Sequence, residues 1–222
     1  MWWLLVPVVG LVGKAVYDAI SDSAPPPPAP RKKTTLELNL ARLGSLVRGR
    51  SGYKVAIVGQ PGAGKSSLLK KMTDGKVRPL PVVGVQTDAT DWSLDAACDL
   101  VGSFENFSFV DVPGYDTVSH PLNVVMTGFP FGEFDCFVFV LRGKLRSADE
   151  MMFKAIIRSG VKCCIARSYS DSLEPEEVAV AEKDVRGRLE LDKSVPVQFF
   201  SNRTGTGVAE LFQAIRGRCG VP

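Results

Sequence analysis

A glycine-rich stretch ends in a lysine and a serine, side chains suited to binding phosphate and its metal ion. The stretch Gly59-Gln-Pro-Gly-Ala-Gly64-Lys65-Ser66 fits the pattern G-x-x-x-x-G-K-[ST], between a run typical of a strand and a segment typical of a helix. The glycines let backbone N–H groups face a phosphate chain at a helix N-terminus. We expect Lys65 to bridge the β- and γ-phosphates and Ser66 to offer its hydroxyl to Mg²⁺. A glycine-rich turn without a ligand is the alternative, which the complete motif disfavours.

A second motif, Asp111-Val-Pro-Gly114, ends another apolar run. We expect its aspartate to meet the Mg²⁺ shell and the Gly114 N–H to meet the γ-phosphate. With both motifs in this order, the chain resembles the Ras-like class of small GTPase domains from about Tyr53 to the C-terminus. The resemblance implies a three-layer α/β fold, with a mostly parallel six-stranded sheet and helices on both faces. It also implies a switch threonine between the motifs, for which Thr87 and Thr90 both remain candidates.

A carboxylate in the loop after the fifth strand would select guanine. Guanine presents N1–H and an amine that a carboxylate can accept, whereas adenine has an acceptor at N1. The family supplies this carboxylate as [NT]-K-x-D, and this chain has Ser168-Tyr169-Ser170-Asp171. The aspartate matches, Tyr169 is expected to stack on the base in place of the lysine stem, and Ser168 to keep one hydrogen bond. An N-cap aspartate before a helix at Glu174 is the alternative for Asp171.

The last family element has its counterpart in Ser201-Asn202-Arg203, followed by Thr-Gly-x-Gly and a helix. The resemblance implies that a backbone N–H near Asn202 contacts the guanine carbonyl oxygen and that Arg203 packs beside the base. The residues assigned to nucleotide and cofactor binding are Gly59, Gly62, Ala63, Gly64, Lys65, Ser66, Ser67, Asp111, Gly114, Ser168, Tyr169, Asp171, Ser201, Asn202 and Arg203. The expected metal set is Ser66, Thr87, Thr90 and Asp111, and the expected catalytic set is Lys65, Thr87, Thr90 and Gly114.

The glutamine that often orients the attacking water is missing. Ras-like enzymes that hydrolyse GTP alone often carry it directly after the D-x-P-G glycine, where this chain has Tyr115. The chain thus looks like the hydrophobic-substituted GTPases, among them the Era-like and immunity-related groups. Gly62 stands where some relatives bind potassium through an asparagine, so slow hydrolysis is expected. His120, the single histidine, is interpreted as a surface residue before Pro121 rather than as a water-positioning group.

Short apolar runs alternate with capped helical stretches after residue 52. This alternation predicts a largely parallel sheet covered on both faces. Ser147 and Glu150 predict a capping box at one helix start, and Phe129, Phe131 and Phe134 are expected in the core rather than in a partner-binding patch. Strands are expected at 53–58, 107–112, 135–141, 161–167 and 195–200, and helices at 66–72, 147–159, 174–191 and 208–219.

The N-terminal 33 residues differ in composition from the rest of the chain. Fifteen of the first 20 are apolar, and a helix over Trp2–Ile20 would be roughly 28 Å long, marginal for a bilayer span. We therefore expect a membrane anchor at residues 1–20, with a cleaved signal peptide or a helix in the interface plane as alternatives. Residues 21–33 are expected to form a proline-rich basic linker. Its basic end at residues 31–33 would place the body in the cytoplasm.

Residues 34–222 are predicted to form the GTPase domain, beginning with an amphipathic helix. Thr34 and Glu37 have capping-box spacing, and an apolar face of leucines and a valine follows up to Gly52: Leu36, Leu40, Leu43 and Val47. Packing against the domain is favoured over binding to a partner.

Composition excludes some classes of protein. The 222 residues are 45% hydrophobic, which is enough for a core, and carry a formal net charge of +3. The first 33 residues supply +2 of that charge, so the remainder shows no footprint for nucleic acid. Five cysteines, two of them adjacent in an apolar run, favour a reducing compartment over a disulfide framework.

These features predict a membrane-tethered, Mg²⁺-dependent protein that binds GTP and GDP, hydrolyses GTP slowly and acts as a switch. Expected partners are the nucleotide, the membrane, and a second copy of the chain or an activating protein. A nucleotide-binding membrane scaffold with negligible hydrolysis is one alternative. An adenine-nucleotide protein is another, which Asp171 together with residues 201–203 disfavours.

Overall fold

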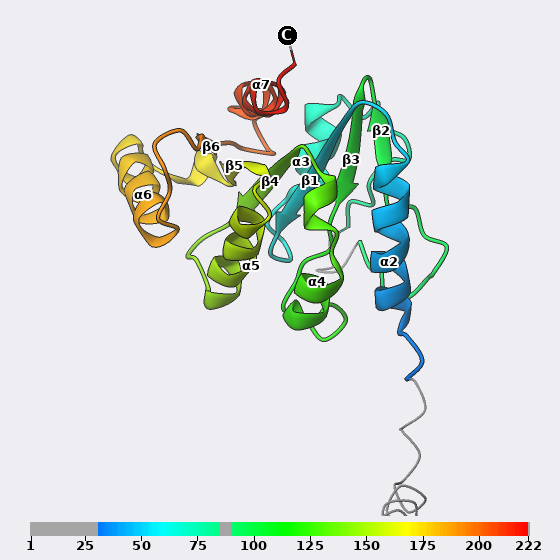
Figure 1. The fold of residues 1–222 in the computed structure, drawn as a ribbon. Helices are drawn as coiled ribbons and strands as arrows, with labels where there is room; N and C mark the ends of the chain where they lie inside the picture. Colours follow the sequence, from blue (N-terminus) through cyan, green and yellow to red (C-terminus); the bar gives the residue numbers. More distant parts are fainter. Residues whose placement is uncertain (1–30, 85–89, 222) are drawn as a thin grey trace, which may run out of the picture. The chain divides into compact units, whose positions relative to one another are not determined.

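Six strands form one sheet in the order β2-β3-β1-β4-β5-β6 (Figure 1). The structure is a computed structural model that describes residues 31–84 and 90–221. Strand β2 runs antiparallel to β3, and all other neighbouring strands are parallel. The strands are β1 (Tyr53–Gly59), β2 (Gly102–Phe104), β3 (Phe107–Asp111), β4 (Cys136–Leu141), β5 (Lys162–Arg167) and β6 (Val197–Phe199).

The central strands are apolar along their length because helices cover both faces of the sheet. All residues of β4 are buried, as are the last five of β1 and the last five of β5. Burial on both faces removes the alternation of polar and apolar side chains, which explains why the sequence shows continuous runs there. The predicted α/β class and the mostly parallel six-stranded sheet are confirmed.

The helices divide between two apolar clusters, one on each face of the sheet. Buried side chains of α2 (Thr35–Arg48), α4 (Leu122–Gly128), α5 (Ser147–Arg158) and α6 (Pro175–Arg188) belong to the first cluster. Those of α3 (Lys65–Met72) and α7 (Val208–Cys219) belong to the second. Two short 3₁₀ turns, η1 (Phe131–Glu133) and η2 (Ser170–Ser172), complete the described elements.

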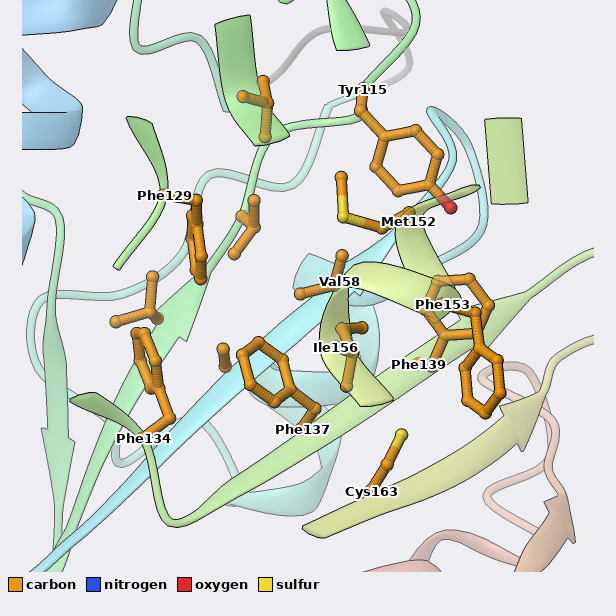
Figure 2. Packing of buried hydrophobic residues seen from close by; sticks show 14 of the residues in the cluster. Val58, Tyr115, Phe129, Phe134, Phe137, Phe139, Met152, Phe153, Ile156 and Cys163 are labelled. Atoms are coloured by element: carbon orange, nitrogen blue, oxygen red, sulfur yellow. The ribbon is translucent and has the colours of Figure 1, made fainter. Parts of the chain in front are cut away.

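Aromatic rings fill the first cluster between the sheet and its helices (Figure 2). Phe129 stacks on Phe134 with ring centroids 5.4 Å apart, and Phe134 lies 5.4 Å from Phe137 on β4. Phe131 meets Phe129 edge-on at 5.0 Å. Offset and edge-to-face pairs of this kind add to the free energy gained by burial. The expectation that these phenylalanines belong to the core is confirmed.

Helix α2 forms where the sequence predicts it. Thr34 Oγ1 accepts from the N–H of Glu37 at 3.3 Å, and Glu37 Oε2 accepts from the N–H of Thr34 at 2.7 Å, which closes the predicted capping box. The predicted apolar face is buried. Asn39, fully buried on the same helix, donates to the carbonyls of Trp92 and Asp95, both at 2.8 Å. The helix therefore holds the loop that leads from Thr90 into the sheet.

Some element boundaries differ from the prediction. The prediction lacks strand β2 and helix α4. Strand β2 gives a weak signal because it is a half-buried edge strand that contains Gly102. Helix α4 gives a weak signal because it is rich in β-branched residues, which are weak helix formers. The capping box at Ser147 and Glu150 is wrong, because Arg146 is the cap residue and its N–H donates to Asp149 Oδ2 at 2.8 Å. Helix α6 ends at Arg188, three residues before the predicted end.

The predicted membrane anchor at residues 1–20 lies outside the described residues, as does the linker up to residue 30. Within residues 31–84 and 90–221, no helix is long and apolar enough to cross a bilayer.

Candidate nucleotide site

The glycine-rich loop joins the end of β1 to the start of α3, as the motif requires. Gly64 precedes the helix in a left-handed conformation with φ +91°, and a Cβ there would lie 2.6 Å from Asn202 Nδ2. Any other residue at this position would combine backbone strain with a clash. The loop thus turns its backbone toward the first turn of α3, where the helix dipole favours an anion.

Lys65 lies buried at the base of this loop. Its Nζ donates to the carbonyls of Gly59 at 2.8 Å and Gln60 at 2.9 Å. The ammonium group is therefore held beside the loop that would surround a phosphate. Bound phosphate oxygens would meet a cation that is already desolvated, which strengthens the attraction.

Three oxygen-bearing side chains meet beside the first turn of α3. Ser66 Oγ donates to Asp111 Oδ2 at 2.6 Å, and Thr90 Oγ1 donates to the same oxygen at 3.3 Å. Asp111 Oδ1 is buried without a hydrogen-bond partner among the described residues. Burial raises the pKa of the Asp111 carboxyl, and the charge of Lys65 and the two hydroxyl donors oppose that shift.

This oxygen set fits a magnesium ion. Mg²⁺ prefers hard oxygen ligands and is commonly held by few protein groups together with phosphate oxygens and water. An unsatisfied, buried carboxylate oxygen would gain from such a cation. Of the two candidate switch threonines, Thr90 lies in this set, and Thr87 lies outside the described residues.

Gly114 packs directly against the phosphate loop. A Cβ on Gly114 would lie 2.4–2.6 Å from atoms of Pro61, so the second motif approaches the first as closely as a glycine permits. Residues of both motifs line a cleft of about 380 Å³, a size typical of small-molecule sites. Its lining includes most of the predicted phosphate residues, together with Arg142 and Tyr169, which follow β4 and β5. The full lining is Pro61, Gly62, Gly64, Lys65, Ser66, Ser67, Val82, Val83, Gly84, Thr90, Val112, Pro113, Gly114, Arg142 and Tyr169.

Tyr115 points into the protein core and does not line the cleft. Its side chain is 1% exposed and belongs to the same buried cluster as Met152 (Figure 2). The Tyr115 hydroxyl donates to Asp149 Oδ1 at 2.6 Å, and Gln60 of the phosphate loop donates to Asp149 Oδ2. Burial and the adjacent carboxylate raise the pKa of Tyr115 well above its usual value. Asp149 thus connects both motifs to α5, a role that its sequence position does not reveal.

His120 is buried, so its interpretation as a surface residue is wrong. The ring is 1% exposed; Nε2 accepts from the Trp92 N–H at 3.1 Å and lies 3.3 Å from Asp91 Oδ1, and Nδ1 lies 3.0 Å from Ser119 Oγ. Contacts with residues distant in sequence cause this burial, and no local pattern announces it. The histidine joins the segment after Thr90 to the segment after Gly114.

The residues predicted to bind the base lie in neighbouring loops. Asp171 Oδ2 lies 2.7 Å from both Nε and Nη2 of Arg203. Hydrogen bonding from Ser201, and then from Arg203, lowers the pKa of the Asp171 carboxyl. The cap residue of α6 is Glu174, so the alternative of Asp171 as that N-cap is wrong.

Asn202 connects the last loop to the phosphate loop. Its Nδ2 donates to the Gly64 carbonyl at 3.0 Å, and its own carbonyl accepts from Lys71 Nζ at 2.9 Å. Ser201 is fully buried, and its hydroxyl accepts from the N–H groups of Arg203 and Thr204, both at 3.2 Å. The predicted base and phosphate regions therefore share direct contacts.

Comparisons of sequence agree with this geometry. Residues 54–167, just over half of the chain, match the family described as 50S ribosome-binding GTPase. The GTPase Der of Pseudomonas putida is 25% identical over 225 residues, which cover 95% of this chain and 45% of Der. The probable GTP-binding protein EngB of Shewanella sediminis is 26% identical over 194 residues, 82% of this chain and 84% of EngB. This chain therefore spans less than half of the length of the Der relative.

Solved structures share the fold at low identity. Era of Aquifex aeolicus, bound to GDP and AlF4⁻, superposes with a TM-score of 0.58 and 20% identity, covering 76% of this chain and 57% of that chain. A probable GTP-binding protein engB gives a TM-score of 0.55 with 15% identity, covering 76% of this chain and 99% of that chain.

Proposed function

The chain belongs to the 50S ribosome-binding GTPase family, and from that membership we propose that it binds GTP and GDP with Mg²⁺, hydrolyses GTP and switches between two states. The observation that carries this proposal is the meeting of Ser66, Thr90 and Asp111 beside the phosphate loop. Thr90 comes from the segment between the two motifs, and its contact with the γ-phosphate would distinguish the triphosphate state from the diphosphate state.

Each side chain has a defined task in this proposal. Lys65 neutralises charge on the β- and γ-phosphates, and the Gly114 N–H donates to the γ-phosphate. The hydroxyls of Ser66 and Thr90 and the carboxylate of Asp111 would hold Mg²⁺, which would neutralise phosphate charge when bound. Asp171 would accept both hydrogens of the guanine edge, while Asn202 keeps the base loop against Gly64.

Nucleotide competition tests this assignment. The full-length protein is titrated with a fluorescent GTP, with and without EDTA, and with a fluorescent GDP, which GDP and ADP then displace in competition. We expect a guanine preference of about 100-fold or more and weaker triphosphate binding without Mg²⁺. Equal displacement by ADP would contradict the assignment of Asp171, and no binding of either nucleotide would contradict the proposed function.

Hydrolysis by the isolated chain is proposed to be slow. Tyr115 is engaged with Asp149 and absent from the cleft lining, so it offers no group to orient water there. A partner that supplies an arginine can raise turnover by roughly 10³–10⁵ in such mechanisms. We propose a second copy of the chain as the donor, and membrane tethering would favour the pairing by raising local concentration.

A dilution series tests self-activation. Phosphate release per molecule should rise with protein concentration in solution or with density on liposomes. Constant specific activity would contradict pairing, and a fast rate at every concentration would show that the chain already positions water.

The position of Tyr115 also favours a second candidate, a nucleotide-binding membrane scaffold. A single-turnover measurement without detectable phosphate release would support it.

The membrane anchor and the domain boundaries are part of the proposal. The apolar composition of residues 1–20 and the proline-rich linker at 21–33 support a tether to a cytoplasmic GTPase domain at 34–222. Deletion of residues 1–20 should move the protein from the membrane fraction to the soluble fraction with unchanged nucleotide affinity. Full-length protein in the soluble fraction would contradict the anchor.

A further inference from the structure

Arg142 lies at the nucleotide cleft, although no motif points to it. It directly follows β4, is exposed, and lines the cleft together with Tyr169. The guanidinium carbon lies 4.3 Å from the centroid of the Tyr169 ring, and Nη1 donates to the Gly62 carbonyl at 3.3 Å. One side chain thus contacts both the predicted base subsite and the phosphate loop.

The ends of two adjacent strands place this pair. Leu141 is in register with Arg167, and the Leu141 carbonyl accepts from both the N–H and the hydroxyl of Ser168, at 2.9 and 3.0 Å. Arg142 directly follows β4, and Tyr169 follows Ser168, the first residue after β5. They come together because this short polar junction ends the pairing of β4 with β5.

Tyr169 is presented to the cleft at a cost. Its backbone adopts a left-handed conformation with φ +60°, which is unfavourable for a non-glycine residue, and it remains 43% exposed. A large ring in such a conformation, with a cation over its face, is suited to stacking against a flat base. Tyr169 occupies the position where the family pattern has lysine, so the cation usual at that position is absent there.

We propose that Arg142 supplies the missing cation from a different strand and positions Tyr169 as the stacking surface for the guanine base. The contact of Arg142 with Gly62 fixes the Tyr169 ring relative to the phosphate loop, so that the base and the phosphates of one nucleotide can bind at the same time. The inference rests on the proposed function, since it assigns a specificity role within the same nucleotide site. Arg142 is a positioning residue, because it acts through the tyrosine ring.

Variants of the full-length protein separate this role from others. Tyr169→Ala should weaken GDP and GTP binding about tenfold or more, as expected when a base loses its aromatic partner, and Tyr169→Phe should restore most of that affinity. Arg142→Ala should weaken binding by several-fold, consistent with a lost cation–π contact. Arg142→Lys should recover part of this loss. The double variant Arg142→Ala with Tyr169→Ala should bind no more weakly than Tyr169→Ala alone.

Tripolyphosphate provides the decisive comparison because it has phosphates and no base. Tripolyphosphate competes with fluorescent GDP for the site. Its inhibition constant, corrected for the GDP affinity of each protein, should be the same in wild type and Arg142→Ala. If the Arg142→Ala protein loses as much affinity for tripolyphosphate as for GDP, Arg142 is a phosphate ligand. If its turnover falls while its nucleotide affinity is unchanged, Arg142 is catalytic. Either result would overturn the proposal, as would unchanged nucleotide affinity in the Arg142→Ala protein.

Lys144→Ala is the matched control, since Lys144 is an exposed cation in the same loop; we expect wild-type affinity. Thermal unfolding of each variant identifies any loss of fold, and the Phe and Lys replacements keep the test valid if an alanine variant is unstable. If wild type binds no guanine nucleotide, the proposed function fails. If wild type binds and the variants equal it, only the role of Arg142 fails.

Discussion

The proposed phosphate side and the proposed base side of the nucleotide site are built in different ways. On the phosphate side, both motifs are complete, and Ser66 and Asp111 lie 2.6 Å apart although 45 residues separate them in sequence. On the base side, the family pattern is broken at Ser168 and Tyr169, and the neighbouring cation comes from Arg142 on another strand. One region keeps the family's sequence pattern, and the other departs from it.

The chemistry of the two ligand parts explains this difference. Phosphates and Mg²⁺ are bound by backbone N–H groups and hard oxygens at fixed distances, so few residue types can serve. A flat base is bound by stacking and by one carboxylate, and several side chains can stack. We therefore expect substitution to be tolerated more readily on the proposed base side than on the proposed phosphate side.

The strongest test of the comparison is Lys65→Ala. The variant removes a buried cation, and we expect GTP affinity to fall by at least about 100-fold, because charged hydrogen bonds to phosphate are lost. Fluorescent GTP titration measures this change. Lys70→Ala, on an exposed position of the same helix, should bind as wild type does. Unchanged affinity in folded Lys65→Ala protein would remove the assignment of the phosphate loop.

Asp171→Asn tests the residue of the base side that still matches the family. The amide should weaken GTP binding by about 100-fold and improve xanthosine triphosphate binding, since xanthine has a carbonyl where guanine has its amine. Asp184→Asn is the control: it removes an exposed carboxylate of α6, so guanine preference should persist. A variant that retains wild-type guanine preference would show that another residue recognises the base.

Tyr115→Phe tests whether this tyrosine is part of the scaffold behind the phosphate side. Loss of its hydroxyl removes one donor to the buried Asp149 carboxylate, so the free energy of unfolding should fall by about 1–3 kcal/mol. Urea denaturation measures this change, and Tyr53→Phe, at the start of β1, should alter stability far less. Nucleotide turnover should stay near wild type; a large loss of turnover with unchanged stability would place the hydroxyl in catalysis instead.

Burial of polar residues marks the limit of prediction from sequence. His120 and Asn39 look like ordinary surface residues in the sequence, yet both are buried and hydrogen bonded to the loop that follows Thr90. Asp149 likewise looks like a helix-start carboxylate, yet it also accepts from Tyr115 and Gln60. Their partners are distant along the chain, so a local pattern carries no signal for them.

The sequence by itself determined the class of fold, most of its strands and helices, and the motifs of the proposed phosphate site. It could do so because a buried parallel strand leaves a continuous apolar run, and because phosphate binding demands glycine, lysine and serine at fixed spacing. The tertiary structure decided that Thr90 reaches Asp111, where Tyr115 points, and that Arg142 stands over Tyr169. These features depend on which strand ends and loops become neighbours, and that neighbourhood exists only when the sheet has formed.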